Sequence, residues 1–144
     1  MAVVDTNILV YAVNVVSPFK KPCEDCLTTL RQGSVPWHTT WGVVYEFLRV
    51  TTHPRVFPTP LSASEAWSFL RALFDSPAFS MLTATARHPE VVSEFVREIP
   101  HLTGNLWHDA ETAILMREHG IRRIYTRDVD FHRFPFLEVV DPAR

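Results

Sequence analysis

Two acidic residues stand at positions where their carboxylates could meet. Asp5 directly follows the apolar run AVV, and Asp128 stands just after a second run, IYT. Both runs are typical of short buried strands. The carboxyl ends of parallel strands lie at one edge of a sheet, where ligands bind in such folds. Two like charges placed together at that edge need a chemical reason, because they repel each other.

Two further acids lie on segments with helical periodicity. Glu46 falls within 40–53 at the border of the apolar face, and Asp109 falls in the first turn of a helix predicted over 105–120. A carboxylate beside a buried face is costly unless it is paired. Glu111 follows Asp109 by two residues, so helical geometry turns it away, and we interpret it as a solvated surface acid.

Each of these acids also has a structural explanation when taken alone. Asp5 and Asp109 suit the N-terminal ends of helices, and Asp128 suits a turn. Glu46 could form an ion pair with a nearby arginine, either Arg49 or Arg71. Taken together, the acids form a converging set whose repulsion a cation would relieve. Oxygen ligands select hard cations such as Mg²⁺ or Mn²⁺, which suit phosphodiester hydrolysis.

Short apolar segments alternate with helical patterns along the whole chain. The strand segments are 2–4, 34–39, 78–82, 122–126 and 136–141. The helical segments are 6–14, 22–32, 40–53, 65–75, 88–99 and 105–120. This alternation predicts an α/β fold whose mainly parallel sheet is covered by helices on both faces. A length of 144 residues fits one domain, 1–144.

The charge balance limits how the chain could hold a nucleic acid. Its formal net charge is −2, from 14 basic and 16 acidic residues, which argues against binding by bulk electrostatics alone. A local basic patch remains compatible with this balance. All basic residues except Lys20 and Lys21 are arginines, whose planar fork suits phosphate.

Two other features give little indication of function. Cys23 and Cys26 form a lone C-x-x-C inside a predicted amphipathic helix, without the preceding strand of a redox motif or a second pair to complete a zinc site. The N-terminus lacks a basic region and meets an acid at Asp5, and no apolar run approaches the roughly 20 residues of a membrane span. We therefore expect a cytoplasmic protein.

The ordered motifs resemble those of the PIN-domain family, and within it the VapC toxins of bacterial toxin–antitoxin pairs. The matching segments are VVDTNILVYA, YEFLRVTTHPRVF, GNLWHDAETAILMREHG and YTRDVDFHRFP. They occur in the family's order and spacing and span nearly the whole chain. One departure is the bulky pair Trp107 and His108 before Asp109, where smaller or apolar residues are expected.

This resemblance implies a three-layer α/β/α fold and an endoribonuclease that depends on Mg²⁺ or Mn²⁺. Its catalytic, metal-binding carboxylates would be Asp5, Glu46, Asp109 and Asp128. Supporting polar residues would be Thr6, Asn7 and Thr126. The resemblance also implies a cognate VapB-type antitoxin and a homodimer. Asp130 could reach the metal through water or serve only as a turn residue.

Several residues near these acids could contact RNA. The candidates for phosphate are Arg49, His53, Arg55, Arg127, His132 and Arg133. Phe131 and Phe134 could stack on a base or pack in the core. Two other functions remain open. One is a non-catalytic PIN module that binds RNA or a partner. The other is an aspartate phosphotransfer protein, which the absence of a late lysine and the presence of Asn7 disfavour.

Overall fold

The computed structural model describes residues 1–144 and contains one parallel five-stranded sheet. Its strands are β1 (Ala2–Val4), β2 (Trp37–Thr40), β3 (Phe79–Leu82), β4 (Arg123–Tyr125) and β5 (Glu138–Val140). They lie in the order β3-β2-β1-β4-β5, and every neighbouring pair is parallel. The α/β class with a mainly parallel sheet is therefore confirmed.

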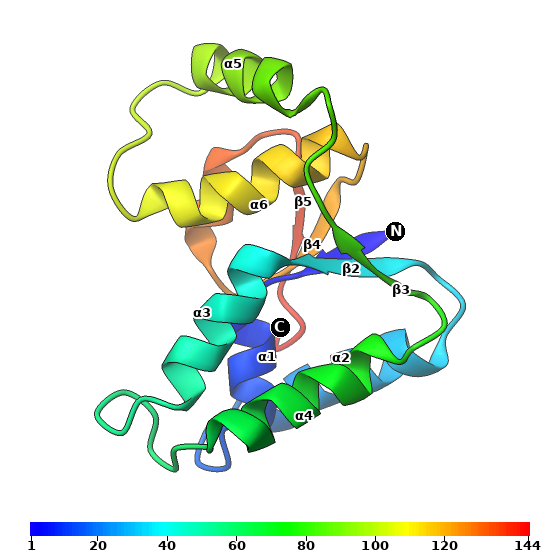
Figure 1. Cartoon of the computed structure of the whole chain (residues 1–144), viewed down its shortest axis with the longest axis vertical. Coiled ribbons are helices and arrows are strands. Elements are labelled where there is room, and N and C mark those ends of the chain that lie inside the picture. Colours follow the sequence, from blue (N-terminus) through cyan, green and yellow to red (C-terminus); the bar gives the residue numbers. More distant parts are fainter.

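Helices cover both faces of this sheet. They are α1 (Thr6–Val13), α2 (Lys20–Gln32), α3 (Trp41–Thr51), α4 (Ala63–Phe74), α5 (His88–Glu98) and α6 (Leu106–Glu118). The short 3₁₀ helix η1 spans Val129–Arg133. In Figure 1, α5 and α6 lie above the strands and α1 to α4 lie below them, which gives three layers. No helix is both long and apolar enough to cross a membrane.

Each face of the sheet has its own hydrophobic core. Successive strand residues point to opposite faces, and β1 shows this directly: Val4 packs with helices α1 to α4, whereas Val3 packs with α5 and α6. Both valines are fully buried. The continuous apolar runs of the strands are explained by this double coverage.

The predicted elements are all present, with local differences at their ends. Helix α2 begins at Lys20, two residues before the predicted start at Pro22, after a Phe19 that makes no side-chain cap. Asn105 occupies the predicted cap position of α6, but its side chain makes no capping hydrogen bond. The 3₁₀ helix η1 was not predicted, because its aromatic and basic residues alternate as in a loop.

The strand order places a ligand-binding crevice between β1 and β4. The chain leaves β1 and forms β2 and β3 on one side, then returns to form β4 and β5 on the other. The connections after β1 and β4 therefore run in different directions, and parallel sheets bind ligands at such a point. Asp5 and Asp128 both follow strands that flank this crevice.

The side chain of Thr40 caps the N-terminus of α3, the helix that carries Glu46. Its Oγ1 accepts a hydrogen bond from the backbone N–H of Val43, 3.1 Å away, and the residue is fully buried. Replacement Thr40→Val should lower the free energy of unfolding by about 1–2 kcal/mol, because the buried N–H loses its acceptor. Urea denaturation measures this change. Thr40→Ser keeps the acceptor, so a loss as large as that of Thr40→Val would contradict the capping role.

Candidate metal centre

Asp5 is held in place from several directions at the end of β1. Its Oδ1 accepts the backbone N–H of Thr6 at 2.8 Å, which makes it the N-cap of α1. Its Oδ2 accepts the hydroxyl of Thr126 at 2.7 Å and the amide of Asn7 at 3.2 Å. The side chain therefore caps the helix and also contributes a fixed carboxylate to the crevice.

Thr126 and Asn7 join the loop after β4 to the loop after β1. The Thr126 hydroxyl donates to Asp5 and accepts hydrogen bonds from the Asn7 amide and the backbone N–H of Asp128, both at 3.0 Å. The side-chain oxygen Oδ1 of Asn7 accepts a hydrogen bond from the backbone N–H of Arg127 at 3.1 Å. Thr126 is completely buried. These bonds fix Asp5 and Asp128 relative to each other.

Glu46 approaches the same crevice from α3. The hydroxyl of Thr6 donates to its Oε2 at 3.0 Å. Glu46 forms no ion pair with Arg49 or Arg71, so the structural explanation for this carboxylate does not hold. The two polar residues that follow Asp5 thus orient two acids. Thr6 donates a hydrogen bond to Glu46, and Asn7 donates one to Asp5.

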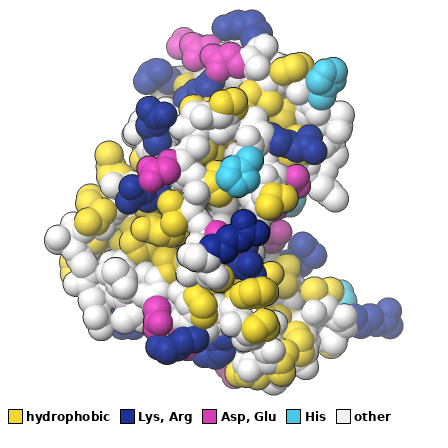
Figure 2. All heavy atoms as spheres, turned by 180° about the vertical axis from the view of Figure 1, so that it is seen from behind, with side chains coloured by type: hydrophobic (Ala, Val, Ile, Leu, Met, Phe, Trp, Pro, Cys, Tyr) yellow, Lys and Arg dark blue, Asp and Glu magenta, His cyan; other side chains and the backbone are white.

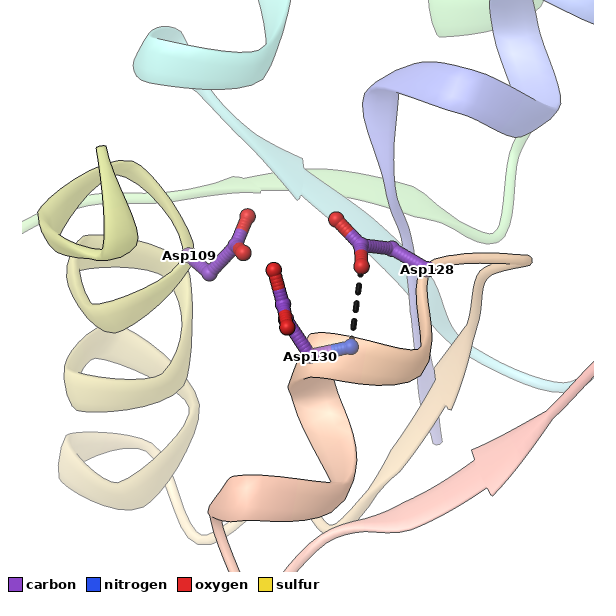
Figure 3. A group of neighbouring side chains, drawn as sticks. All are labelled: Asp109, Asp128 and Asp130. Carbon is purple, nitrogen blue, oxygen red and sulfur yellow. Dashed lines mark hydrogen bonds between the residues drawn. The ribbon is translucent and has the colours of Figure 1, made fainter.

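A second group of carboxylates faces this one. Figure 3 shows Asp109 from α6, Asp128 from the loop after β4 and Asp130 from η1 pointing toward one another. One oxygen from each lies within 4.8 Å of the others. Asp128 also accepts the backbone N–H of Asp130 at 2.9 Å, which turns the chain and brings Asp130 inward. Asp130 therefore serves as a turn residue and also lies among the acids.

A cleft of about 280 Å³ is lined by all of these acids except Asp130. Its lining residues are Asp5, Thr6, Asn7, Val10, Tyr11, Glu46, Val50, Asp109 and Asp128. The cleft thus contains carboxylates from four different segments of the chain and is open to solvent. Glu111 lies outside it and is exposed, as expected, with its carboxylate against Gly42 at the start of α3.

The buried position of Asp5 disfavours its charged form. The pKa of Asp5 is raised to about 6, mainly by burial and in smaller part by the negative charges of Glu46 and Asp128. The hydrogen bonds from Thr126 and Thr6 act in the opposite direction. A carboxylate that remains partly protonated near neutral pH, despite the hydrogen bonds it accepts, lacks a compensating positive charge.

Asp109 is affected in the same way. The pKa of Asp109 is raised to about 7, mainly by burial and then by the negative charges of Asp128, Asp5, Asp130 and Glu46, in that order. No arginine or lysine forms an ion pair with Asp109. The set of oxygen donors fits a divalent cation, which would supply the charge that the protein itself does not provide.

The residues that were expected to contact RNA differ in whether their side chains are free at the surface. Phe131 and Phe134 are buried in the core beside α5 and α6, so the stacking interpretation is wrong and the packing interpretation is confirmed. Arg127 is also not free, because its Nε donates to Asp141 at 3.0 and 3.2 Å. Its guanidinium lies 3.5 Å from the centre of the Phe19 ring.

The remaining basic candidates lie at the surface. Arg133 is exposed, and its Nε lies 3.6 Å from Asp130. Arg49 and Arg55 are exposed and form no ion pair, His53 is half-buried, and His132 is exposed. Figure 2 shows that basic side chains on the rear face form small groups interspersed with acidic ones. Contact with RNA would therefore depend on a few local arginines.

Comparison with known proteins identifies the family. A model of the PIN domain matches residues 2–137. The chain belongs to the PIN-domain family. Ribonuclease VapC48 of Mycobacterium tuberculosis is 30% identical over 139 residues, which cover 96% of this chain and 94% of that protein. Ribonuclease VapC37 of the same organism is 32% identical over 135 residues, covering 93% and 92%. These relatives carry the VapC name that the motifs predicted.

Solved structures of this PIN-domain type share the fold. Mycobacterium tuberculosis VapC20, described as a sarcin–ricin loop cleaving toxin, superimposes with a TM-score of 0.68 at 20% identity and covers 98% of this chain and 100% of its own. VapBC2 from Rickettsia felis, bound to a promoter DNA fragment, gives a TM-score of 0.67 at 17% identity, with 96% of each chain covered. At these identities the likeness supports the three-layer α/β/α fold.

The metal-free protein should become less stable as the pH rises from about 4 to about 7. The folded pKa values of Asp5 and Asp109 exceed the unfolded value of 3.8, so the folded state binds more protons over this range. Each pKa unit corresponds to about 1.4 kcal/mol, and we expect a total loss of a few kcal/mol. Urea denaturation in EDTA at several pH values measures it.

Addition of a divalent cation is the control for this pH-dependent loss of stability. A cation that binds only the folded state stabilises it by mass action. Mg²⁺ or Mn²⁺ at millimolar concentration should therefore recover stability at pH 7.5, and the gain should be smaller in Asp109→Asn. A pH dependence of stability in EDTA that is the same in Asp109→Asn as in the unmodified protein would contradict the raised pKa of Asp109.

The ion pair between Arg127 and Asp141 should stabilise the loop that carries Asp128. The side chain of Arg127 is only 17% exposed and that of Asp141 only 16%. Asp141→Ala should lower the free energy of unfolding by about 2 kcal/mol, less than the roughly 3–5 kcal/mol of a fully buried pair. The exposed pair of Arg123 and Glu138 offers a matched control, and Glu138→Ala should cost under about 1 kcal/mol. Equal losses of stability in Asp141→Ala and Glu138→Ala would show that the pair of Arg127 and Asp141 stabilises the protein no more than an exposed pair does.

Proposed function

We propose that the chain is a metal-dependent endoribonuclease and the toxin of a VapBC-type toxin–antitoxin pair. The observation that carries this proposal is the convergence of Asp5, Glu46, Asp109 and Asp128 in one cleft. The ribonuclease names of relatives that are at least 30% identical over nearly the full chain support the same activity. Mg²⁺ or Mn²⁺ fits the all-oxygen donor set.

The carboxylates of the cleft would hold the cation in place. Asp5, Asp109 and Asp128 would be the main ligands, with Glu46 completing the set from α3 and Asp130 acting directly or through water. When bound, such an ion lowers the pKa of coordinated water and stabilises charge on phosphate oxygens. No covalent nucleophile from the protein is required for hydrolysis of the phosphodiester.

The protein's own contribution is to fix the acids before substrate arrives. The hydroxyl of Thr126 and the amide of Asn7 hold Asp5, and Thr6 holds Glu46. Because these bonds are already formed, little reorganisation is needed when RNA binds. Because the cleft is open to solvent, a phosphate can reach the carboxylates, and exposed arginines such as Arg49 would bind neighbouring phosphates.

The partners follow from the same assignment. We propose a cognate VapB-type antitoxin, a homodimer and a cytoplasmic location, as expected of a VapC toxin. Co-expression with the product of a small adjacent reading frame tests the antitoxin. A stable complex in which RNA cleavage is suppressed would support the pairing, whereas full activity in the presence of every adjacent product would favour a solitary nuclease.

Asp5→Asn should reduce Mg²⁺- or Mn²⁺-dependent cleavage of single-stranded RNA by at least about 100-fold, because it removes a charged ligand while preserving shape. A fluorescently labelled RNA oligonucleotide measures the rate. Glu111→Gln makes the equivalent change at an exposed acid outside the cleft and should stay within about twofold. Urea denaturation should show that both variants remain folded.

Two results would contradict this function. One is cleavage by Asp5→Asn at the rate of the unmodified protein. The other is cleavage that persists in EDTA after purification to constant specific activity. A protein that binds the oligonucleotide but never cleaves it with either metal would instead be a binding module.

A further inference from the structure

A third aspartate follows a strand at the carboxyl edge of the sheet but does not line the cleft. Asp141 directly follows β5, as Asp5 directly follows β1. Its two carboxylate oxygens accept the Nε–H of Arg127 at 3.0 and 3.2 Å. Asp141 also accepts the backbone N–H of Ala143 at 2.9 Å, and only 16% of its side chain is exposed. The C-terminal segment therefore supplies a fixed carboxylate whose closest cationic partner is Arg127.

Arg127 stands in the chain between two residues of the metal centre. Thr126 donates a hydrogen bond to Asp5, and Asp128 lines the cleft. The side chain of Arg127 instead leads away from the acids, and its guanidinium lies 3.5 Å from the centre of the Phe19 ring. The positive charge that is nearest to Asp128 along the chain is thus held outside the cleft by a carboxylate and an aromatic ring.

This guanidinium is nevertheless close to the wall of the cleft. Tyr11 lines the cleft, and the centre of its ring lies 5.8 Å from the guanidinium carbon of Arg127. The Tyr11 ring also contacts Phe19 edge-on, with ring centres 5.4 Å apart. Because Arg127 also adjoins Asp128 in the chain, its long side chain has the acids within reach once it is released from its present partners.

The cleft would attract a released arginine. None of its four carboxylates forms an ion pair with an arginine or a lysine. Crowded acids are stabilised by a nearby positive charge, and the planar fork of arginine binds carboxylate through two parallel hydrogen bonds. A guanidinium in the cleft would occupy the same oxygens that a divalent cation needs. Arginine and the cation are therefore competitors for one set of ligands.

We propose that Asp141 is a positioning residue that keeps Arg127 out of the metal centre. By binding the guanidinium outside the cleft, Asp141 leaves the carboxylates free for the cation. Arg127 is then not itself needed for metal binding, and it interferes only when Asp141 is absent. This inference rests on the proposed function, and it extends the metal centre to a residue of the C-terminal segment that does not line the cleft.

The affinity of the full chain for Mn²⁺, measured by isothermal titration calorimetry without RNA, tests this role. Asp141→Asn should weaken Mn²⁺ binding by about 10-fold or more, because the released Arg127 competes for the carboxylates. Asp141→Glu keeps the charge that holds Arg127 and should retain most of the affinity. Asp141→Ser keeps an acceptor for the N–H of Ala143 and provides a second release of Arg127 should Asp141→Asn unfold.

A double variant separates competition from a merely structural role of the ion pair. Arg127→Gln removes the competitor, so the double variant Arg127→Gln, Asp141→Asn should bind Mn²⁺ nearly as tightly as the unmodified chain. If the pair only held the loop in place, the double variant would bind at least as weakly as Asp141→Asn. In cleavage assays, Asp141→Asn should need more Mn²⁺ for its half-maximal rate but approach the unmodified rate at saturating metal.

A matched control releases an arginine at the opposite edge of the sheet. Glu138→Gln breaks the exposed ion pair with Arg123, the first residue of β4. Because Arg123 lies at the other end of that strand from Asp128, its release should leave the affinity for Mn²⁺ unchanged. Urea denaturation of every variant establishes that it is folded under the conditions of the titration.

Two outcomes would overturn this role of Asp141. One is an unchanged affinity for Mn²⁺ when Arg127 is released in a folded variant. The other is a double variant that binds Mn²⁺ no better than Asp141→Asn. Because the titrations contain no RNA, their result stands even if the unmodified chain fails to cleave RNA. Conversely, a failure of the proposed role of Asp141 leaves the cleavage result of the unmodified chain intact.

Discussion

The hydrogen bond from Thr126 to Asp5 is the contact on which the site depends. It joins the ends of β1 and β4, residues 121 positions apart in the sequence, through a fully buried hydroxyl. Together with the bond from the Arg127 N–H to the Asn7 side chain, it holds the two loops against the repulsion between Asp5 and Asp128. The same hydroxyl accepts the N–H of Asp128, so one side chain determines the positions of both acids. The protein's own contacts therefore place both acids.

The fold makes this arrangement possible by providing an edge where several elements end. The parallel sheet brings the carboxyl ends of β1 and β4 together, and coverage on both faces allows α3 and α6 to approach from opposite sides. The stability that these cores supply offsets the cost of keeping carboxylates partly buried. This balance explains why the raised pKa values of Asp5 and Asp109 are tolerated in a folded protein.

The sequence was informative wherever a local pattern determines structure. The alternation of apolar strands and amphipathic helices predicted the layers, and the position of Asp5 and Asp128 after strands predicted which acids would meet. The inward turn of Asp130 was left open, because it depends on a hydrogen bond to the Asp128 side chain that a two-residue spacing only permits. Likewise, no local pattern distinguishes a buried Phe131 from an exposed one when the η1 segment alternates aromatic and basic residues.

The arginines show most clearly what only the tertiary structure can decide. Arg127 and Arg49 both lie within three residues of a cleft acid, and their neighbours in the sequence suggest the same role. Arg127 meets Asp141 from the C-terminal segment and Phe19 from the loop before α2, so its charge is neutralised. Arg49 is exposed and forms no ion pair with an acid. The two walls of the cleft are consequently unequal in free charge, and a bound polyanion would be drawn toward α3.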